Sequence, residues 1–335
     1  RTKLFLRTAE FYWHEGHTAH ATADEAIEEM YRILDIYERF CLEEAAIPVF
    51  KGPKSESERF PGAQITTSIE AMMWDKRALQ SGTSHYFGQN FAKAFDIKYL
   101  DKNNVLQFCE TTSWAISSRI IGAMIMVHGD DQGLVLPPRL APIQAVVVPI
   151  FKNDDEKSKV MEVADRVFVE LKAAGLRIKM DDRDNVSSGF KFNDWEMRGV
   201  PVRVEIGPKD VEKGSVALAR RDKPGKEGKT FVPQTNLSST VNLLLTEIQA
   251  ALLKRATEYR DANIHEPKDY EDLKRIVADG WAFAYWCESL ECEAKVKEEA
   301  KATTRNIPVN QPDKEGICIV CGKPSKRKVY FARAY

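Results

Sequence analysis

A change of residue pattern near Pro142 constrains the fold most, because the two sides of it must fold by different rules. Residues 145–151 form an almost continuous, valine-rich apolar run, which is typical of a strand buried on both faces. The further elements that we expect are strands at 176–180 and 200–206, helices at 154–174 and 236–262, and a charged loop at 220–226. Strands that alternate with helices predict a compact, largely parallel α/β unit.

Length and charge bound the remaining choices. The 335 residues suffice for two or three domains at roughly 100–200 residues each. Lys and Arg number 49 against 50 Asp and Glu, so the net charge of −1 excludes coating of nucleic acid by bulk charge but permits a local basic patch. The longest apolar run, at 120–127, is too short for a bilayer span, and no export signal opens the chain. We therefore expect no membrane partner and a cytoplasmic location.

The region before Pro142 begins without Met and enters a strand pattern at 4–8 directly, which we interpret as the continuation of a longer protein. Thr22 and Glu25 have the spacing of a capping box, and apolar residues recur at helical spacing behind them as far as Cys41. Cys41 lies on the apolar face of this helix, and Cys109 lies in a strand-like run. Both are expected in the core.

The other four cysteines form two pairs near the end of the chain. Cys287 and Cys292 have C-x4-C spacing, and Cys318 and Cys321 have the C-x2-C spacing of a tight metal-binding knuckle. Disulfides are disfavoured in the cytosol, so we expect a zinc ion with a structural role, since four thiolates leave no open position for a substrate. A lineage that kept the cysteines without holding metal is the alternative.

Two polar segments are candidates for a substrate site. The residues that suggest a pocket for a compact, charged substrate are Arg7, Glu10, Trp13, Glu15, His17 and His20. Metal binding by the histidines at 14, 17 and 20 is disfavoured, because no carboxylate follows at a ligand-like interval. The second segment pairs 80–85 with 117–119, where small hydroxyl residues permit close approach to a nucleotide and Arg119 suits a phosphate. Walker and Rossmann glycine motifs are absent from the sequence.

Taken together, these segments closely resemble the prolyl-tRNA synthetases, which are class II aminoacyl-tRNA synthetases. The matching stretches, in the order of that family, are 6–20 in the motif 2 region, 80–90, 112–130, 133–139, 194–201 and the terminal 331–335. The resemblance spans essentially the whole chain. The four cysteines are similar to those of the archaeal and eukaryotic-type subgroup.

The resemblance implies an α/β multidomain fold. Residues 1–142 would form an incomplete class II catalytic core on an antiparallel sheet, 143–250 an α/β anticodon-binding domain, and 251–335 a small α+β domain of zinc-binding type. It also implies a ligase that activates L-proline with ATP and Mg²⁺ to prolyl-adenylate and transfers the prolyl group to the 3′ end of tRNA(Pro). The full-length protein would be a homodimer with a structural Zn²⁺.

By the same resemblance, catalysis would depend on arginines that hold the ATP phosphates, Arg7 and Arg119. The other ATP-binding residues would be Thr8, Gln80 and Thr83. The proline pocket would consist of Trp13, Glu15, Phe60, His85 and Ser117. These types suit the chemistry, since a small ring needs an aromatic slot and its ammonium group needs a carboxylate.

The remaining implied roles lie outside the catalytic region. The positions that match anticodon-reading residues are Glu196, Arg203, Lys209 and Asp210, and the zinc ligands would be Cys287, Cys292, Cys318 and Cys321. Carboxylates suit exocyclic amines and arginine suits a guanine edge on bases splayed out of a loop. Without the resemblance, such charges would be interpreted as a solvated surface.

The chain departs from the family pattern in several places. Ala115 replaces the usual glycine of a Ser-Trp-Gly stretch. Three elements that the family carries further upstream are missing from this sequence: an Arg-x-Glu, the Thr-x-Glu loop and motif 1. The interval between Trp13 and Ser113 is too short for a large editing insertion. Two alternatives therefore remain at this point: a catalytically incomplete tRNA-binding fragment, and a paralogue that uses the pocket for another amino acid.

Overall fold

The computed structural model describes residues 2–223 and 225–335; Arg1 and Pro224, at the chain start and in the charged loop, lie outside the described residues. The chain divides into two compact units. The first comprises Arg1–Glu43, Ile47–Val127 and Thr257–Tyr335, and the second comprises Glu44–Ala46 and His128–Ala256. The C-terminal segment thus belongs to the same unit as the candidate catalytic region.

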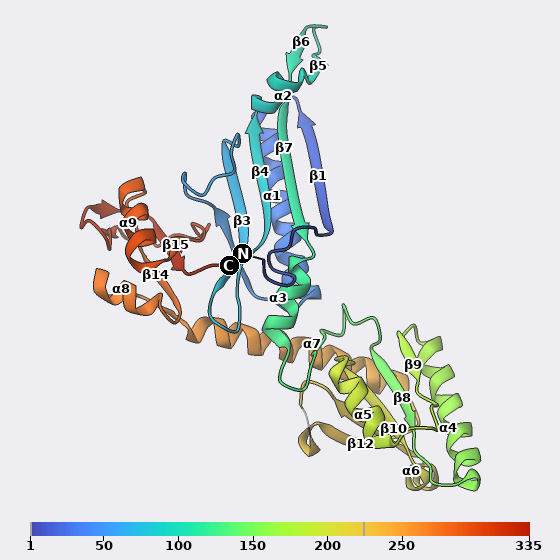
Figure 1. The fold of residues 1–335 in the computed structure, drawn as a ribbon. Helices are drawn as coiled ribbons and strands as arrows, with labels where there is room; N and C mark the ends of the chain where they lie inside the picture. The colour runs from blue at the N-terminus through green and yellow to red at the C-terminus, as the bar shows by residue number, and fades with distance from the viewer. Residues whose placement is uncertain (1, 224) are drawn as a thin grey trace. The chain divides into compact units, whose positions relative to one another are not determined.

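A five-stranded antiparallel sheet in the order β1-β7-β4-β3-β2 forms the centre of the first unit. Its strands are β1 (Trp13–His20), β2 (Val49–Pro53), β3 (Ile65–Met72), β4 (Ala78–Gly88) and β7 (Glu110–Ser117). Its helical elements are α1 (Ala23–Arg39) with a π-helical turn (Phe40–Glu44), α2 (Asn90–Phe95) and α3 (Arg119–His128), and a hairpin pairs β5 (Lys98–Leu100) with β6 (Leu106–Phe108). Helix α1 lies along one face of the sheet (Figure 1).

The start of α1 confirms the expected capping box. The Thr22 hydroxyl accepts a hydrogen bond from the Glu25 backbone N–H, and the Glu25 carboxylate accepts one from the Thr22 N–H. Met30 and Leu34 are fully buried on the face of α1 toward the sheet, and Cys41 and Cys109 are buried as predicted. The predicted strand at 4–8 is wrong.

Residues 4–8 instead follow a tight turn. The backbones of Lys3 and Arg7 exchange hydrogen bonds across it, and Phe5 has a φ of 60°. Leu6 is buried beside Gly122, and a Cβ atom at position 122 would collide with the Leu6 side chain. Burial of one apolar side chain therefore fixes a turn where the sequence alternation indicated a strand.

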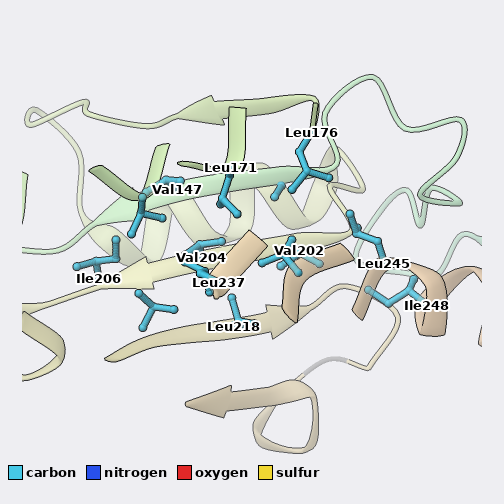
Figure 2. Packing of buried hydrophobic residues seen from close by; sticks show 14 of the residues in the cluster. Val147, Leu171, Leu176, Val202, Val204, Ile206, Leu218, Leu237, Leu245 and Ile248 are labelled. Carbon is cyan, nitrogen blue, oxygen red and sulfur yellow. The ribbon is translucent and has the colours of Figure 1, made fainter. Parts of the chain in front are cut away.

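The second unit contains a mixed sheet in the order β12-β11-β10-β8-β9. Its strands are β8 (Ala145–Pro149), β9 (Ile178–Met180), β10 (Val202–Ile206), β11 (Ser215–Arg220) and β12 (Lys229–Pro233). Its helices are α4 (Asp154–Ala173), α5 (Ser188–Met197), α6 (Pro208–Lys213), a 3₁₀ turn (Lys226–Gly228) and α7 (Leu237–Ala262), whose last residues belong to the first unit. Side chains of β8, β10, β11, α4 and α7 interdigitate in its core (Figure 2).

The prediction that these strands are parallel is correct for three of them. Strands β9, β8 and β10 are parallel, whereas β11 and β12 are antiparallel additions at one edge. The charged loop after Arg220 joins β11 to β12 without a crossover helix, and a short connection of this kind imposes antiparallel pairing. All five residues of β8 are buried, as the valine run predicted.

The C-terminal segment forms a second sheet, β13-β14-β18-β15, in the first unit. The elements of the C-terminal segment are β13 (Ile264–His265), α8 (Tyr270–Ile276), β14 (Trp281–Tyr285), α9 (Leu290–Ala300), β15 (Thr303–Thr304), β16 (Gly316–Ile317), β17 (Pro324–Ser325) and β18 (Lys328–Ala332). Strands β16 and β17 pair with each other outside the four-stranded sheet. The stretch after β15 docks on β2, where Ile307 N–H donates to Pro53 O at 2.8 Å and Asn306 Nδ2 donates to Phe50 O at 2.8 Å. Met72 and Ala78 share a core with Trp281 and Tyr330.

This docking depends on a glycine in β2. A Cβ atom at Gly52 would overlap the carbonyl oxygen of Ile307, which is backbone and cannot rotate away. Gly52→Ala is therefore expected to lower the free energy of unfolding of the first unit by about 1–3 kcal/mol. Denaturant unfolding followed by tryptophan fluorescence measures the loss. Gly189→Ala in α5, where only Ser187 Oγ lies nearby at 3.9 Å, is the control and should not destabilise the protein.

Candidate functional site

Two neighbouring cavities, of about 440 and 160 Å³, lie on the sheet face opposite α1. Strand alternation explains which side chains reach them, since successive residues of a strand point to opposite faces. Trp13 and Glu15 of β1 line the larger cavity, while His14 between them contacts Tyr37 of α1, Nδ1 to Oη at 3.1 Å. Sheet pairing places Ser113, Ala115 and Ser117 of β7 beside β1.

A β-bulge in β4 decides the position of Gln80. Strict alternation from Thr83 and His85 would put Ser81, not Gln80, on the cavity face. The register shifts between Ile69 and Glu70 of β3, so that Ile69 pairs with Gly82 and Glu70 with Gln80. The extra residue turns Gln80 to the same face as Thr83, and both line both cavities.

The 440 Å³ cavity has an aromatic wall and two carboxylates. The rings of Phe60 and His85 lie 4.9 Å apart between centroids, and Trp13 completes the wall. The carboxylates are those of Glu58 and Glu15, and Glu15 Oε1 lies 3.1 Å from Nε2 of the exposed His17. The structure thus brings together four of the five residues predicted for proline, Trp13, Glu15, Phe60 and His85.

Histidine 85 is uncharged at neutral pH. Its side chain is buried, with Nδ1 3.0 Å from Thr66 Oγ1 and Nε2 3.1 Å from Thr83 Oγ1. Burial, and secondarily the charge of Lys54, lower the pKa of His85 from 6.5 to about 4. A neutral imidazole offers one donor and one acceptor, which the two hydroxyl groups can match.

The smaller cavity is lined by Ser117 and Arg119 together with Gln80, Thr83 and Trp13. Arg119 Nε donates to Leu6 O at 2.9 Å, and its Nη1 donates to Gln80 O at 3.1 Å. Burial and the nearby charge of Arg7 lower the pKa of Arg119. Ser117, predicted for the proline pocket, therefore lies with the candidate ATP residues.

Arg7 and Thr8 do not line either of these cavities. Arg7 is exposed at the tight turn, close enough to Arg119 to affect its pKa. The Thr8 hydroxyl donates to Glu10 O at 2.7 Å. The structure thus places this pair beside the cavities, on the turn that carries Leu6, while Gln80, Thr83 and Arg119 line them.

Sequence reasoning missed two features of the site. A third cavity, of about 520 Å³, adjoins the 440 Å³ cavity and shares Glu15, Phe60 and Ser113 with it. Three phenylalanines wall this third cavity: Phe87, Phe91 and Phe95. Lys54, whose side chain is 3% exposed, lines the 440 Å³ cavity. The only signal for Lys54 was a lysine in an otherwise unpatterned stretch.

The four anticodon candidates lie in the second unit. Arg203 Nη1 donates to Glu196 Oε1 at 2.8 Å, its Nε donates to Glu205 Oε1 at 2.8 Å, and its guanidinium lies over the Phe192 ring. Lys209 is exposed at the start of α6. Asp210 accepts a hydrogen bond from Gly207 N–H at 2.9 Å and so caps α6. Glu196 and Arg203 are therefore paired with each other, and Asp210 has a structural contact.

Four thiols gather in the C-terminal segment. The sulfur atoms of Cys287, Cys292, Cys318 and Cys321 all lie within 4.8 Å of one another, and Cys287 Sγ is 3.6 Å from the Sγ atoms of both Cys292 and Cys321. A tetrahedral Zn²⁺ with bonds of about 2.3 Å would separate its sulfur ligands by about 3.8 Å. Burial raises the pKa of Cys287 and Cys292, whereas the Lys323 backbone N–H lowers that of Cys321 to about 7. The donor set and spacing fit a zinc ion.

Comparison with known proteins defines the class to which this arrangement belongs. Family models match residues 1–128 (tRNA synthetase class II core domain (G, H, P, S and T)), 144–241 (anticodon binding domain) and 270–335 (prolyl-tRNA synthetase, C-terminal). The antiparallel sheet with its cavities is thus a class II aminoacyl-tRNA synthetase core, accompanied by an anticodon-binding domain.

Individual relatives narrow the class further. The proline–tRNA ligase of Roseiflexus castenholzii is 56% identical over 336 residues, which cover all of this chain and 70% of the relative. That of Deinococcus radiodurans is 49% identical over 343 residues and is covered to 68%. A crystal structure of prolyl-tRNA synthetase from Cryptosporidium parvum, complexed with L-proline and AMP, superimposes with a TM-score of 0.93 at 39% identity over 99% of this chain and 71% of that one. The chain belongs to the prolyl-tRNA synthetase family.

The buried histidine of the site gives a pH-dependent prediction. Because His85 takes a proton only near pH 4 when folded but near 6.5 when unfolded, the unfolded state binds more protons between these values. The stability that neutral His85 contributes is therefore complete above about pH 6.5 and is lost as the pH falls toward 4. NMR of histidine-labelled protein, assigned with His85→Asn, should show no titration of this ring between pH 8 and about 5.5. A midpoint near 6.5 would contradict the assignment.

Proposed function

We propose that this chain carries out the activation of L-proline by ATP and the transfer of the prolyl group to tRNA(Pro). The observation that carries the proposal is the pair of adjoining cavities on one sheet face. One offers an aromatic slot with carboxylates, and the other offers a half-buried arginine, Arg119. A compact amino acid and a phosphate ester can thus meet at Gln80 and Thr83, which line both cavities.

The 440 Å³ cavity suits proline in particular. The apolar ring would lie against Trp13, Phe60 and His85, and the Glu15 carboxylate would pair with the secondary ammonium group. A protonated imidazole would repel that ammonium group, so the low pKa of His85 keeps the slot compatible with a cation. The proline carboxylate would then face Gln80 and Thr83, toward the smaller cavity.

In the activation step a proline carboxylate oxygen would attack the α-phosphorus of ATP. A new C–O–P bond forms as the bond to pyrophosphate breaks, and charge grows on the phosphoryl oxygens and on the leaving group. Arg119 and Arg7 would offset that charge, and the hydroxyl groups of Ser117, which lines the same cavity, and of Thr8 would help to position the phosphates. Mg²⁺ bound with the nucleotide would neutralise phosphate charge, and the described residues that line the smaller cavity include no carboxylate that could hold it there.

The transfer step needs room for the 3′ adenosine of the tRNA beside the prolyl carbonyl. The phenylalanine-walled cavity adjoins the proline slot and offers stacking surfaces for a base. At the other end of the tRNA, Glu196, Arg203, Lys209 and Asp210 would read the anticodon. Arg203 would exchange its contact with Glu196 for a contact with a base edge. Asp210 would contact a base and still accept the hydrogen bond from Gly207 that caps α6.

The wider context follows from the family. We propose a homodimer for the full-length protein and a cytoplasmic location, where tRNA and ATP are available. Among residues 2–223 and 225–335, no helix is both long and apolar enough to cross a bilayer. The alternative function, a tRNA-binding fragment without activation, keeps the anticodon and cysteine regions but forms no prolyl-adenylate.

Proline-dependent ATP–pyrophosphate exchange decides between these functions. The 335-residue chain is expected to exchange label with proline, and neither cysteine nor alanine should substitute for it at equal concentration. The reason is the fit of the ring to the aromatic slot. Absence of exchange together with retained binding of tRNA(Pro) would support the binding fragment instead. Exchange that is faster with another amino acid would support the paralogue.

We further propose that Zn²⁺ occupies the cysteine cluster and stabilises the C-terminal segment. Elemental analysis should find about one zinc ion per chain. Cys318→Ser with Cys321→Ser should release it and lower the thermal stability of the first unit. Cys109→Ala, a buried cysteine outside the cluster, is the control and should keep the metal. A folded wild-type protein without zinc would refute the proposal.

A further inference from the structure

A chain of buried charges connects the C-terminal segment to the cavities. Arg305, one residue after β15, donates from Nη2 to Glu70 Oε2 at 2.9 Å and from Nε to the same oxygen at 3.2 Å. Glu70 is completely buried in β3 and Arg305 is 6% exposed. The backbone fixes the position of the arginine, since its N–H donates to Tyr330 O at 2.8 Å. A pair this deeply buried costs desolvation energy, which invites a functional explanation.

The other carboxylate oxygen of Glu70 faces the site. It accepts from Ser68 Oγ at 3.0 Å and lies 3.5 Å from Lys54 Nζ. The Lys54 ammonium group donates to Gln80 Oε1 at 3.2 Å and is within 3.4 Å of the Arg305 backbone oxygen. The contacts thus run from Arg305 through Glu70 and Lys54 to Gln80.

The chemistry of lysine fixes the orientation of the Gln80 amide. An ammonium group has donors only, so it can bind only the oxygen end of a glutamine side chain. With Oε1 held by Lys54, the Nε2 end must point elsewhere, and it donates to no acceptor among the described residues. Gln80 lines both cavities, so its Nε2 is available as a donor where they meet.

We propose that Arg305 is a positioning residue for the activation step: through Glu70 and Lys54 it holds Gln80 with its Nε2 as a hydrogen-bond donor to the developing acyl phosphate. The inference rests on the proposed function and goes beyond it, because it makes the C-terminal segment a part of the active-site structure. A fixed donor aimed at an oxygen on which charge develops stabilises the transition state more than the ground state.

Removal of the Arg305 side chain should break this series of contacts between Lys54 and Gln80. Without the guanidinium group, Glu70 Oε2 loses its partner, and the carboxylate attracts Lys54 away from Gln80. The amide can then rotate and present its oxygen to the phosphate. Proline binding in the aromatic slot does not depend on this contact, so the loss should fall on kcat rather than on the KM for proline.

A double-mutant cycle tests the proposal in the full natural protein, by proline-dependent ATP–pyrophosphate exchange. Arg305→Leu and Gln80→Ala should each lower kcat by about 10- to 100-fold, with the KM for proline changed by less than about threefold. If Arg305 acts through Gln80, the double variant should be no slower than Gln80→Ala alone. Arg305→Lys, which keeps a positive charge beside the Glu70 carboxylate, should restore part of the rate.

The matched control is Asp279→Ala. It removes the exposed ion pair between Lys76 Nζ and Asp279 Oδ2, 2.7 Å long, which also joins the C-terminal segment to the sheet. Its kcat should equal that of the wild type. A loss as large as that of Arg305→Leu would show that docking alone matters and would overturn the proposal.

Other outcomes are equally decisive. Effects of Arg305→Leu and Gln80→Ala that multiply in the double variant, or a wild-type rate for Arg305→Leu, would refute positioning through Gln80. If Arg305→Leu fails to fold, the cycle with Arg305→Lys replaces it. If the wild type shows no exchange, the proposed function fails, and NMR of the Gln80 side-chain amide then tests the orientation: its resonances should shift in Arg305→Lys but not in Asp279→Ala.

Discussion

The pairing of β4 with β3 on one side and β7 on the other is the constraint on which the first unit depends. Because a strand alternates its side chains between two faces, this pairing assigns one set to the α1 core and the other to the cavities. Gly82 faces Tyr37 and Ile69 on the helix side, while Thr83 and His85 face the site. A slip of one residue would exchange core and site, so the buried face fixes the register.

The β-bulge opposite Ile69 and Glu70 breaks the alternation of β4 beside the cavities, and a second register shift, against β7, lies between Tyr86 and Gly88. The first of these brings Gln80 to the cavity face and pairs it with Glu70, whose charge is balanced inside the protein. Burial of that carboxylate would be unfavourable alone, and Lys54 and Arg305 make it tolerable. Since Arg305 comes from the C-terminal segment, the charge of Glu70 is balanced fully only when that segment is docked.

The charges of the side chains around the two substrate cavities also differ. His85 is held neutral by burial and by Lys54, beside a slot that would receive an ammonium group. Arg119 remains the cation of the smaller cavity, although burial and Arg7 disfavour its charge. The two cavities therefore differ in electrostatic character within one sheet face, and this difference suits an amino acid on one side and a phosphate on the other.

The sequence by itself determined the features that depend on neighbours along the chain. The capping box at Thr22, the buried valine strand after residue 144 and the spacing of the four cysteines could all be predicted, because each is set by local hydrogen bonding, periodicity or ligand geometry. Motif resemblance supplied four of the residues that form the aromatic slot with its carboxylate, Trp13, Glu15, Phe60 and His85. The turn at residues 4–8, the antiparallel pairing of β11 and β12, and the placement of Ser117 with Arg119 were decided by packing in three dimensions. The bulge at Gln80 and the Glu70–Arg305 pair were decided there too, since 235 residues separate those partners and no local pattern encodes a contact at that distance.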